Sequence, residues 1–591
     1  MTTNCSSYPS PTKAPDSEYE NPPPTNPTLH GTALSVLSSL VAHVGPLQQI
    51  LYNNAGFTQA FAKLHEAGVL DAYTPRYDPT VVPISTSNDQ SAAIADPTTA
   101  TPINSVFHSS ANYIEAYKSG ATTPTAVAER FLQSLESDNR NIFIVPTAAD
   151  DLLAAARASA ERYAAGNPLP LDGVPLVVKD EIDVAGTRKT LGLSLDEAKA
   201  RVSVEASKET SWCVQKLLDA GMLFLGKTNM HELGLDTTNN NPNWGTPRNP
   251  YNSGYYSGGS SGGSGAAVGS GIVPIAVGAD GGGSVRVPAA YCGAYGLKPS
   301  HNRVSFAPSL SIAPSVGVIG PIAATMADIE IAYRLMATPD PSTPVQFPAP
   351  GLPTPANKTI GIFTPWFSDC DATVSTHANA ALSVFREKGY ETVEITLPFL
   401  AESRKAHALT ILAEIAEVFC RGNTRGLTPA NKVLVSVGTR ATARDLMLAQ
   451  KLRALMMSHL AHLFAQHPGL IIVTPTMPHA GVPIAPSPSV AAKGSAGVSD
   501  SNTSLRSMQY VFLANWCGCP ALTVPVGYDK ESGMPISVMG MAEWGGEETL
   551  ISWGKVWEQS WEGMNGDLRG NAEGGRKRPE GWIDMFTGGS A

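Results

Sequence analysis

Hydrophobic residues along the chain follow two kinds of pattern. Apolar positions recur at the spacing of one helix face over residues 30–70, 109–120, 123–137, 148–165 and 210–220. Short apolar runs typical of buried strands occur at residues 175–178, 222–225, 272–277, 359–362, 470–473 and 522–524. This alternation predicts an α/β fold with a mixed central sheet covered by helices on both faces.

The pattern also divides the chain into parts. Residues 1–29 are rich in Pro, Ser, Thr and Asn, which predicts a disordered tail. Residues 30–105 are expected to form a helical extension, broken at Gly45-Pro46, and a loop over residues 78–101. The extension lacks the Lys/Arg face of a membrane-surface helix, so we expect it to pack on the body of the protein.

Composition limits the class of protein. Hydrophobic residues make up 42% of the 591 residues and charged residues only 16%, so the chain can bury a large core. The net charge is −10 with no basic run, which argues against a nucleic-acid or anionic-membrane partner. No apolar run approaches the ~18 residues of a membrane span, and the N-terminus lacks a signal-peptide core. The seven cysteines are scattered, and together these features predict a cytoplasmic protein.

The densest chemical signal is a glycine- and serine-rich stretch from Gly258 to Arg286. A flexible linker fits this composition, but both halves adjoin apolar runs, so we expect the glycines inside the fold. Gly263-x-Gly265-x-x-x-Gly269 is near a dinucleotide-binding pattern, and Gly258-x-Ser260-x-Gly262 formally matches a hydrolase nucleophile turn. Both motifs need a strand immediately before them, and residues 249–256 do not read as a strand.

A lysine provides the third interpretation of this stretch. Lys179 ends the buried run at residues 175–178, which is an unusual place for a solvated amine. Lys179, Ser260 and Ser284 together form a residue set that can carry out acyl transfer without histidine.

In these segments the chain resembles the amidase signature family. The matching motifs are Gly173-Val-Pro-x-x-x-Lys179-Asp180, Gly226-Lys-Thr-Asn-Met-x-Glu232-Leu, Gly245-Thr-Pro-x-Asn-Pro250, Gly258-Gly-Ser-Ser-Gly-Gly-Ser264, Asp280-Gly-Gly-Gly-Ser284-Val-Arg286-x-Pro288 and Gly293-x-x-Gly296-Leu-Lys-Pro299. The resemblance implies a single large α/β/α amidase signature domain over residues 106–591. Residues 338–469 match no motif and are expected to be a variable insertion. One departure is Gly281, where the family usually has threonine, so a hydroxyl beside the nucleophile is lost.

The resemblance also implies the catalytic roles. Ser284 is the expected nucleophile, Ser260 the bridging serine and Lys179 the general base. Burial behind apolar residues 174–178 and hydroxyl neighbours are expected to favour the neutral amine that a base requires. The oxyanion hole is expected from four consecutive backbone N–H groups, those of Gly281, Gly282, Gly283 and Ser284.

The remaining site residues have supporting roles. Asp280 and Arg286 are expected to orient the nucleophile loop, and the residues expected to contact substrate are Gly234, Asp236 and Ser260. His231 is expected to be structural, because the lysine scheme needs no histidine. His459 and His462 have no third ligand nearby in the sequence, so we expect no metal there.

The expected function is that of an amidohydrolase, which cleaves the C–N bond of a linear, non-peptide carboxamide through a serine acyl-enzyme. No cofactor and no metal are expected, and the expected partner is a small-molecule amide. Two alternatives stay open: acyl transfer or amidotransfer (or ester cleavage) through the same acyl-enzyme, and a catalytically inactive binding protein. Residues 30–70 are a candidate homodimer contact.

Overall fold

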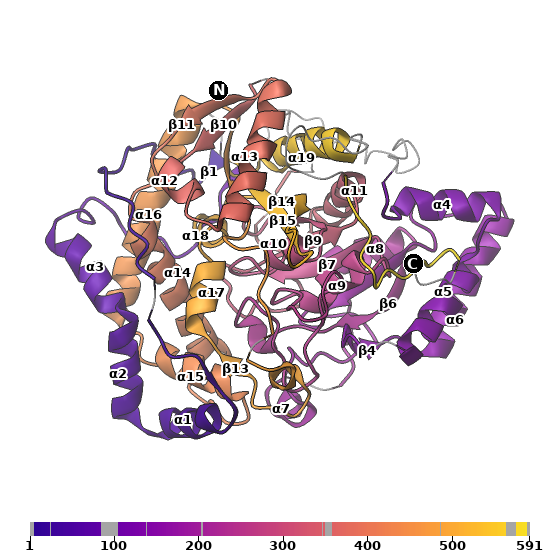
Figure 1. Cartoon of the computed structure of the whole chain (residues 1–591), viewed down its shortest axis with the longest axis horizontal. Helices are drawn as coiled ribbons and strands as arrows, with labels where there is room; N and C mark the ends of the chain where they lie inside the picture. Colours follow the sequence, from indigo (N-terminus) through magenta and orange to yellow (C-terminus); the bar gives the residue numbers. More distant parts are fainter. Residues whose placement is uncertain are drawn as a thin grey trace.

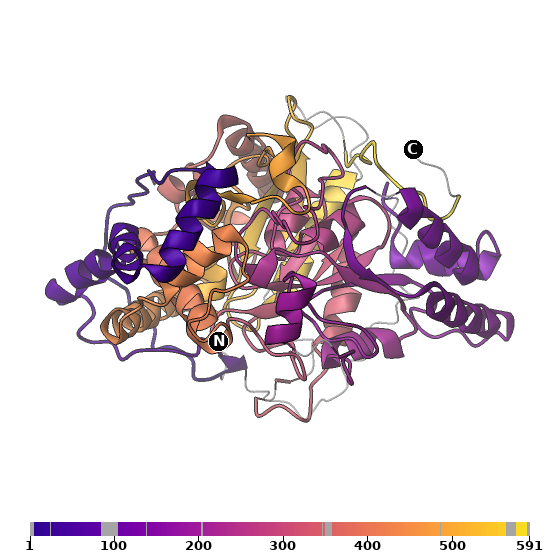
Figure 2. The same cartoon turned by 90° about the horizontal axis from the view of Figure 1, so that it is seen from below.

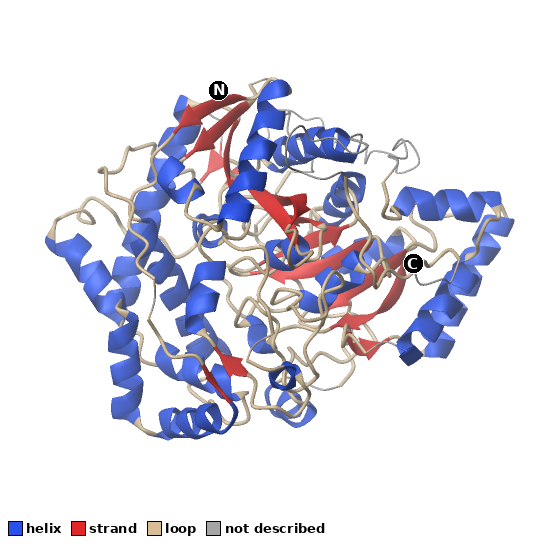
Figure 3. Cartoon of the chain, in the orientation of Figure 1, coloured by secondary structure: helices blue, strands red, loops and turns tan. Residues whose placement is uncertain are grey.

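A mixed sheet of 11 strands crosses the molecule, with helices on both of its faces (Figures 1 and 3). The computed structural model describes residues 5–23, 25–83, 105–137, 139–202, 205–345, 347–348, 357–484, 486–562 and 575–587. The strands, in spatial order, are β11 (Glu391–Glu394), β10 (Thr359–Ile362), β12 (Leu470–Pro475), β15 (Pro535–Met541), β14 (Ala521–Tyr528), β8 (Tyr295–Lys298), β9 (Val318–Ala323), β7 (Ile275–Asp280), β5 (Pro175–Lys179), β6 (Leu223–Thr228) and β4 (Phe143–Pro146).

Parallel and antiparallel pairs occur in the same sheet. β5 runs parallel to both of its neighbours, β6 and β7, and all five of its residues are buried. A strand covered on both faces needs such a continuous apolar sequence. From β12 through β15, β14 and β8 to β9, each strand is antiparallel to the next. The mixed sheet between helices confirms the predicted fold class.

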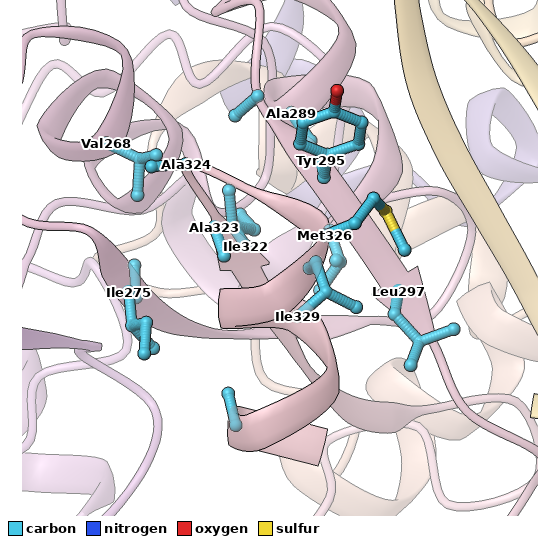
Figure 4. Packing of buried hydrophobic residues seen from close by; sticks show 14 of the residues in the cluster. Val268, Ile275, Ala289, Tyr295, Leu297, Ile322, Ala323, Ala324, Met326 and Ile329 are labelled. Carbon is cyan, nitrogen blue, oxygen red and sulfur yellow. The ribbon is translucent and has the colours of Figure 1, made fainter. Parts of the chain in front are cut away.

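The described part of the domain contains helices that pack on the sheet and helices that pack mainly on other helices. They are α4 (Ser110–Ser119), α5 (Pro124–Ser137), α6 (Ala149–Ala164), α7 (Leu195–Arg201), α8 (Trp212–Asp219), α9 (Gly262–Gly269), α10 (Arg286–Tyr291), α11 (Met326–Met336), α12 (Thr364–Phe367), α13 (Ala372–Glu387), α14 (Leu400–Glu414), α15 (Pro429–Gly438), α16 (Ala443–Gln466), α17 (Ser501–Ser507), α18 (Phe512–Cys517) and α19 (Glu547–Glu562). Figure 4 shows the packing between the layers, where Ile275 of β7, Ile322 of β9 and Ile329 of α11 belong to one buried cluster.

Residues 31–66 form three further helices on one side of the domain. They are α1 (Gly31–His43), α2 (Gly45–Ala55) and α3 (Phe57–Glu66), and they pack against α14, α15 and α16 (Figures 1 and 2). Among the described residues, no single helix has the length and apolar composition of a membrane span. α1 and α2 pass that test only when taken together, and they meet at a bend of 106°.

The N-terminal tail is ordered where the structure describes it. The Ala14 backbone N–H donates to His459 Nδ1 at 3.1 Å, and the Tyr19 hydroxyl donates to Asp369 at 2.7 Å. β2 (Leu29–His30) pairs with β13 (Val498–Ser499), and β1 (Cys5–Ser6) pairs with β3 (Val82–Pro83). The prediction of disorder is therefore wrong for residues 5–23 and 25–29, because composition does not register partners that are hundreds of residues away.

Two other predicted segments differ from the structure or fall outside it. Residues 338–469, predicted to be a variable insertion, contribute β10 and β11 to the central sheet, where both strands pair in parallel. These two strands are therefore part of the central sheet, while the variability of the segment stays a prediction. Most of the loop predicted over residues 78–101, namely residues 84–101, lies outside the described residues.

The packing of α3 on the domain generates a stability prediction. Phe61 is fully buried against the body, so Phe61→Ala is expected to lower the free energy of unfolding by about 3–5 kcal/mol. Val36 of α1 is 54% exposed, and Val36→Ala is expected to change the free energy of unfolding by less than about 0.5 kcal/mol. Urea unfolding of both variants measures the difference, and equal effects would show that α3 does not pack as described.

Candidate active site

The predicted catalytic residues lie where β5 and β7 end. The two strands are parallel neighbours with Val178 opposite Val277, so their carboxyl ends meet at one edge of the sheet. Lys179 is the last residue of β5, and Asp280 is the last residue of β7. Ser284 follows in the loop between β7 and α10, and Ser260 lies just before α9.

Lys179 and Ser260 are in direct contact. The Lys179 side chain is 1% exposed, and its Nζ donates to Ser260 Oγ at 2.8 Å and to the Ala279 carbonyl at 3.1 Å. Residues 256–280 are all buried, which excludes a flexible linker for this part of the glycine- and serine-rich stretch. At Gly263, for example, a Cβ would lie 2.5 Å from the Ile142 carbonyl oxygen, so only glycine fits.

Glu181 also reaches the amine of Lys179, a contact that the sequence analysis did not anticipate. Its Oε1 lies 2.7 Å from Nζ, and its side chain is 11% exposed. The turn after β5, closed by the Ile182 N–H on the Lys179 carbonyl at 3.1 Å, holds residue 181 beside the end of the strand. The sequence predicted only apolar groups and hydroxyls around the Lys179 amine, and this prediction omitted the carboxylate of Glu181.

Ser284 is held against the segment that carries Ser260. Its carbonyl accepts the Ser261 N–H at 3.3 Å, and the residue is 8% exposed. Gly283 makes the turn possible, because its φ is +112° and a Cβ there would lie 2.5 Å from Val511 Cγ2. The loop thus brings the predicted nucleophile to the same edge of the sheet as Lys179.

One of the four predicted oxyanion donors is already used. The Gly283 N–H donates to Asp280 Oδ1 at 2.6 Å, so it is not free for a bound oxygen, and its prediction as a donor is wrong. The N–H groups of Gly281, Gly282 and Ser284 have no acceptor within the described part of the chain. These three groups are the ones that a developing oxyanion can use.

A buried ion pair supports the nucleophile loop. Arg286 Nε lies 3.0 Å from Asp280 Oδ2, and both side chains are fully buried. Asn515 of α18 accepts a hydrogen bond from Arg286 Nη2 at 2.6 Å and donates to the Asp280 carbonyl at 2.7 Å. Burial raises the pKa of the Asp280 carboxyl, but the charge and hydrogen bonds of Arg286 outweigh burial and hold that pKa well below its usual range.

The residues predicted to contact substrate separate into two groups. Gly234 adjoins Ser260: its φ is +66°, and a Cβ there would lie 3.4 Å from Ser260 Oγ. Asp236 instead accepts the Thr237 N–H at 2.6 Å and the Ser504 hydroxyl at 2.5 Å. Its carboxylate therefore ties this loop to α17.

His407 of α14 contacts the loop that carries Ser284, and sequence reasoning missed this contact. Its Nε2 donates to the Gly281 carbonyl at 2.8 Å, and a Cβ at Gly282 would lie 3.0 Å from its Cε1. Burial lowers the pKa of His407 to about 4, so the ring is neutral and Nε2 carries the hydrogen that the carbonyl accepts. The ring braces the loop at Gly281, where the family's threonine is absent. No motif surrounds residue 407, so no local signal could have found it.

The other histidines make structural contacts. The His231 backbone N–H donates to the Ser260 carbonyl at 3.0 Å, and burial lowers the pKa of its ring. His459 accepts from the Ala14 N–H and its Nε2 donates to the Thr396 carbonyl at 2.7 Å. Among the described residues, no three His, Cys, Asp or Glu side chains are grouped to hold a metal ion.

Comparison with known proteins identifies the family. The family model Amidase matches residues 126–551. A fatty acid amide hydrolase of Medicago truncatula is 36% identical over 462 residues, which cover 74% of each chain. A glutamyl-tRNA(Gln) amidotransferase subunit of Neisseria gonorrhoeae is 31% identical, and the match covers 68% of this chain and 87% of that one.

A solved structure agrees at the level of the fold. The crystal structure of a bacterial aryl acylamidase of the amidase signature enzymes superposes with a TM-score of 0.66 at 24% identity. The match covers 77% of this chain and 96% of that one. The extent of the family match, together with these similarities, shows that the chain belongs to the amidase signature family.

Proposed function

We propose that this protein is an amidohydrolase that cleaves the C–N bond of a linear carboxamide through an acyl-enzyme on Ser284. The observation that carries the proposal is the 2.8 Å hydrogen bond between Lys179 and Ser260, buried beside the nucleophile loop. Family membership supports amide chemistry in general, and the fatty acid amide hydrolases among the relatives make fatty acid amides the first substrates to test.

In the proposed reaction, Ser284 Oγ attacks the amide carbonyl carbon and its proton passes through Ser260 to Lys179. The carbonyl oxygen becomes an oxyanion that accepts hydrogen bonds from the backbone N–H groups of Gly281, Gly282 and Ser284. The C–N bond then breaks, and Lys179 returns the proton through Ser260 to the leaving amine. Water then attacks the acyl carbon and gives one proton through Ser260 to Lys179. The bond between the acyl carbon and Ser284 Oγ breaks, and that proton returns through Ser260 to Ser284 Oγ as the carboxylic acid leaves.

Amidotransfer is the alternative that a specific comparison favours, because glutamyl-tRNA(Gln) amidotransferase subunits are among the relatives. Such an enzyme passes the released ammonia to a second acceptor. Free amine or ammonia released by the purified chain alone, with no other protein present, supports hydrolysis. Consumption of the amide only in the presence of an added acceptor that takes up the ammonia supports transfer.

Replacing the nucleophile tests the mechanism. Ser284→Ala is expected to lower kcat for amine release by at least about 10³-fold, because no acyl-enzyme forms. Mass spectrometry after exposure to a fluorophosphonate is expected to place the adduct on Ser284. Ser253→Ala removes an exposed serine of the same region and serves as the matched control. Undiminished turnover by Ser284→Ala would exclude the proposed nucleophile.

Breaking the ion pair under the loop tests its support. Arg286→Met leaves Asp280 buried without its partner and is expected to cost about 3–5 kcal/mol of stability near pH 7. Because the folded-state pKa of Asp280 is depressed, the stability from this carboxylate is present above about pH 4 and is lost as the pH falls further. Lys13→Met breaks an exposed pair and is expected to cost less than about 1 kcal/mol. Equal losses in denaturant unfolding would contradict the role of the buried pair.

His407 tests the brace on the oxyanion loop. His407→Leu removes the hydrogen bond to the Gly281 carbonyl and is expected to lower kcat by roughly tenfold, with KM nearly unchanged, since the loop acts on the transition state. His407→Gln retains an N–H donor and is expected to lose less. Steady-state kinetics of the two variants measure kcat and KM separately. A change confined to KM would indicate that His407 acts on substrate binding and not on the oxyanion loop.

A further inference from the structure

The carboxylate of Glu181 changes what the buried lysine can do. Nζ of Lys179 has three hydrogen-bonding neighbours: Ser260 Oγ at 2.8 Å, the Ala279 carbonyl at 3.1 Å and Glu181 Oε1 at 2.7 Å. A carbonyl and a carboxylate only accept hydrogen bonds, and the Ser260 hydroxyl accepts one here. The three acceptors match the three donors of an ammonium group.

An ammonium ion cannot act as a base, so one proton must leave Nζ before Ser284 can be activated. The carboxylate opposes this step, because an opposite charge within hydrogen-bonding distance stabilises the charged form of the amine. Both side chains are withdrawn from water, with exposures of 1% and 11%, so solvent screens their attraction weakly.

Other charged groups around this turn are already engaged. Asp180 accepts the Thr190 hydroxyl at 2.6 Å, Lys189 pairs with Asp183 at 2.6 Å, and Asp280 is paired with Arg286. His231 is neutral near pH 7, because burial lowers its pKa. Burial lowers the pKa of Lys227 to about 8, and this amine donates to the carbonyls of Asp180 and Ile182. Lys227 is therefore a neighbour that the test must separate.

We propose that Glu181 is a positioning residue that holds Lys179 as an ammonium and so sets the pH above which the enzyme is active. The inference rests on the proposed function of Lys179 as the base. When the pH rises, one N–H bond of Lys179 breaks, the proton goes to water, and the electron pair stays on Nζ. The freed lone pair then accepts the proton of Ser260, and Glu181 keeps the amine in place.

The test is the pH profile of kcat/KM for one carboxamide, from about pH 5 to about pH 10, in the wild type and in Glu181→Gln. The isosteric amide keeps a hydrogen-bond acceptor and removes the charge, so the proton leaves Lys179 at lower pH. The acidic limb is therefore expected to move by about 1–3 pH units to lower pH, which raises kcat/KM at least tenfold on the wild-type limb. An unchanged limb, or one that moves to higher pH, overturns the inference.

Controls separate Glu181 from charge in general and from Lys227. Asp219→Asn removes a distant, half-exposed carboxylate and is expected to leave the limb where it is. In a Lys227→Met background, Glu181→Gln is expected to produce the same shift, and a shift that vanishes there assigns the limb to Lys227 and overturns the inference. If Glu181→Gln does not fold, Glu181→Asp draws the charge back by one methylene, and a smaller shift in the same direction is expected.

Failure of this inference is distinct from failure of the proposed function. Ser284→Ala is measured in parallel: if it retains turnover, the proposed nucleophile is wrong, whatever the pH profile shows. If Ser284→Ala is inactive while Glu181→Gln leaves the acidic limb unchanged, only the role of Glu181 is rejected.

Discussion

The parallel pairing of β5 with β7 is the constraint on which the site depends. It brings the last residues of both strands to one edge of the sheet, so that a lysine from one strand reaches a carbonyl at the end of the other. The loop with Ser284 begins at that point, and the Ser261 N–H fastens it to the segment of Ser260. A shift in the register of these two strands would move Lys179 away from both Ser260 and Ser284.

The polar groups at this edge of the sheet are buried, so each one destabilises the fold unless it has a hydrogen-bonding or charged partner. A buried polar group costs free energy unless it has a partner, so each charge here is accompanied by groups that satisfy it. Arg286 and Asn515 satisfy Asp280, while Glu181, Ser260 and a carbonyl satisfy Lys179. Because the two networks meet at the end of β7, the position of the nucleophile loop and the charge state of the base depend on neighbouring parts of one structure.

Local patterns in the sequence predicted the features that local chemistry determines. The buried run before Lys179 indicated a strand, the glycines between apolar runs indicated tight turns inside the fold, and motif order indicated the family. Glu181 lies only two residues after Lys179 in the sequence. Its contact with the Lys179 amine nevertheless depends on how the turn after β5 closes, and no pattern of apolar residues predicts that turn. His407, and the ordered tail around Ala14 and Tyr19, depend on partners hundreds of residues away. Gly283 failed as an oxyanion donor for a similar reason, since the acceptor of its N–H follows from the fold of the loop.

The order of strands in the sheet has a consequence for the growing polypeptide. β4, β6, β5, β7, β9 and β8 are contiguous in space and all come from residues 143–323, so this half of the sheet can assemble while the ribosome is still translating. β8 then keeps an unpaired edge until β14 at residues 521–528 has emerged, and an open edge invites pairing with other nascent chains. Protection of that edge by a chaperone, or slow translation between the two halves, would decide how much of the newly made protein reaches its native state.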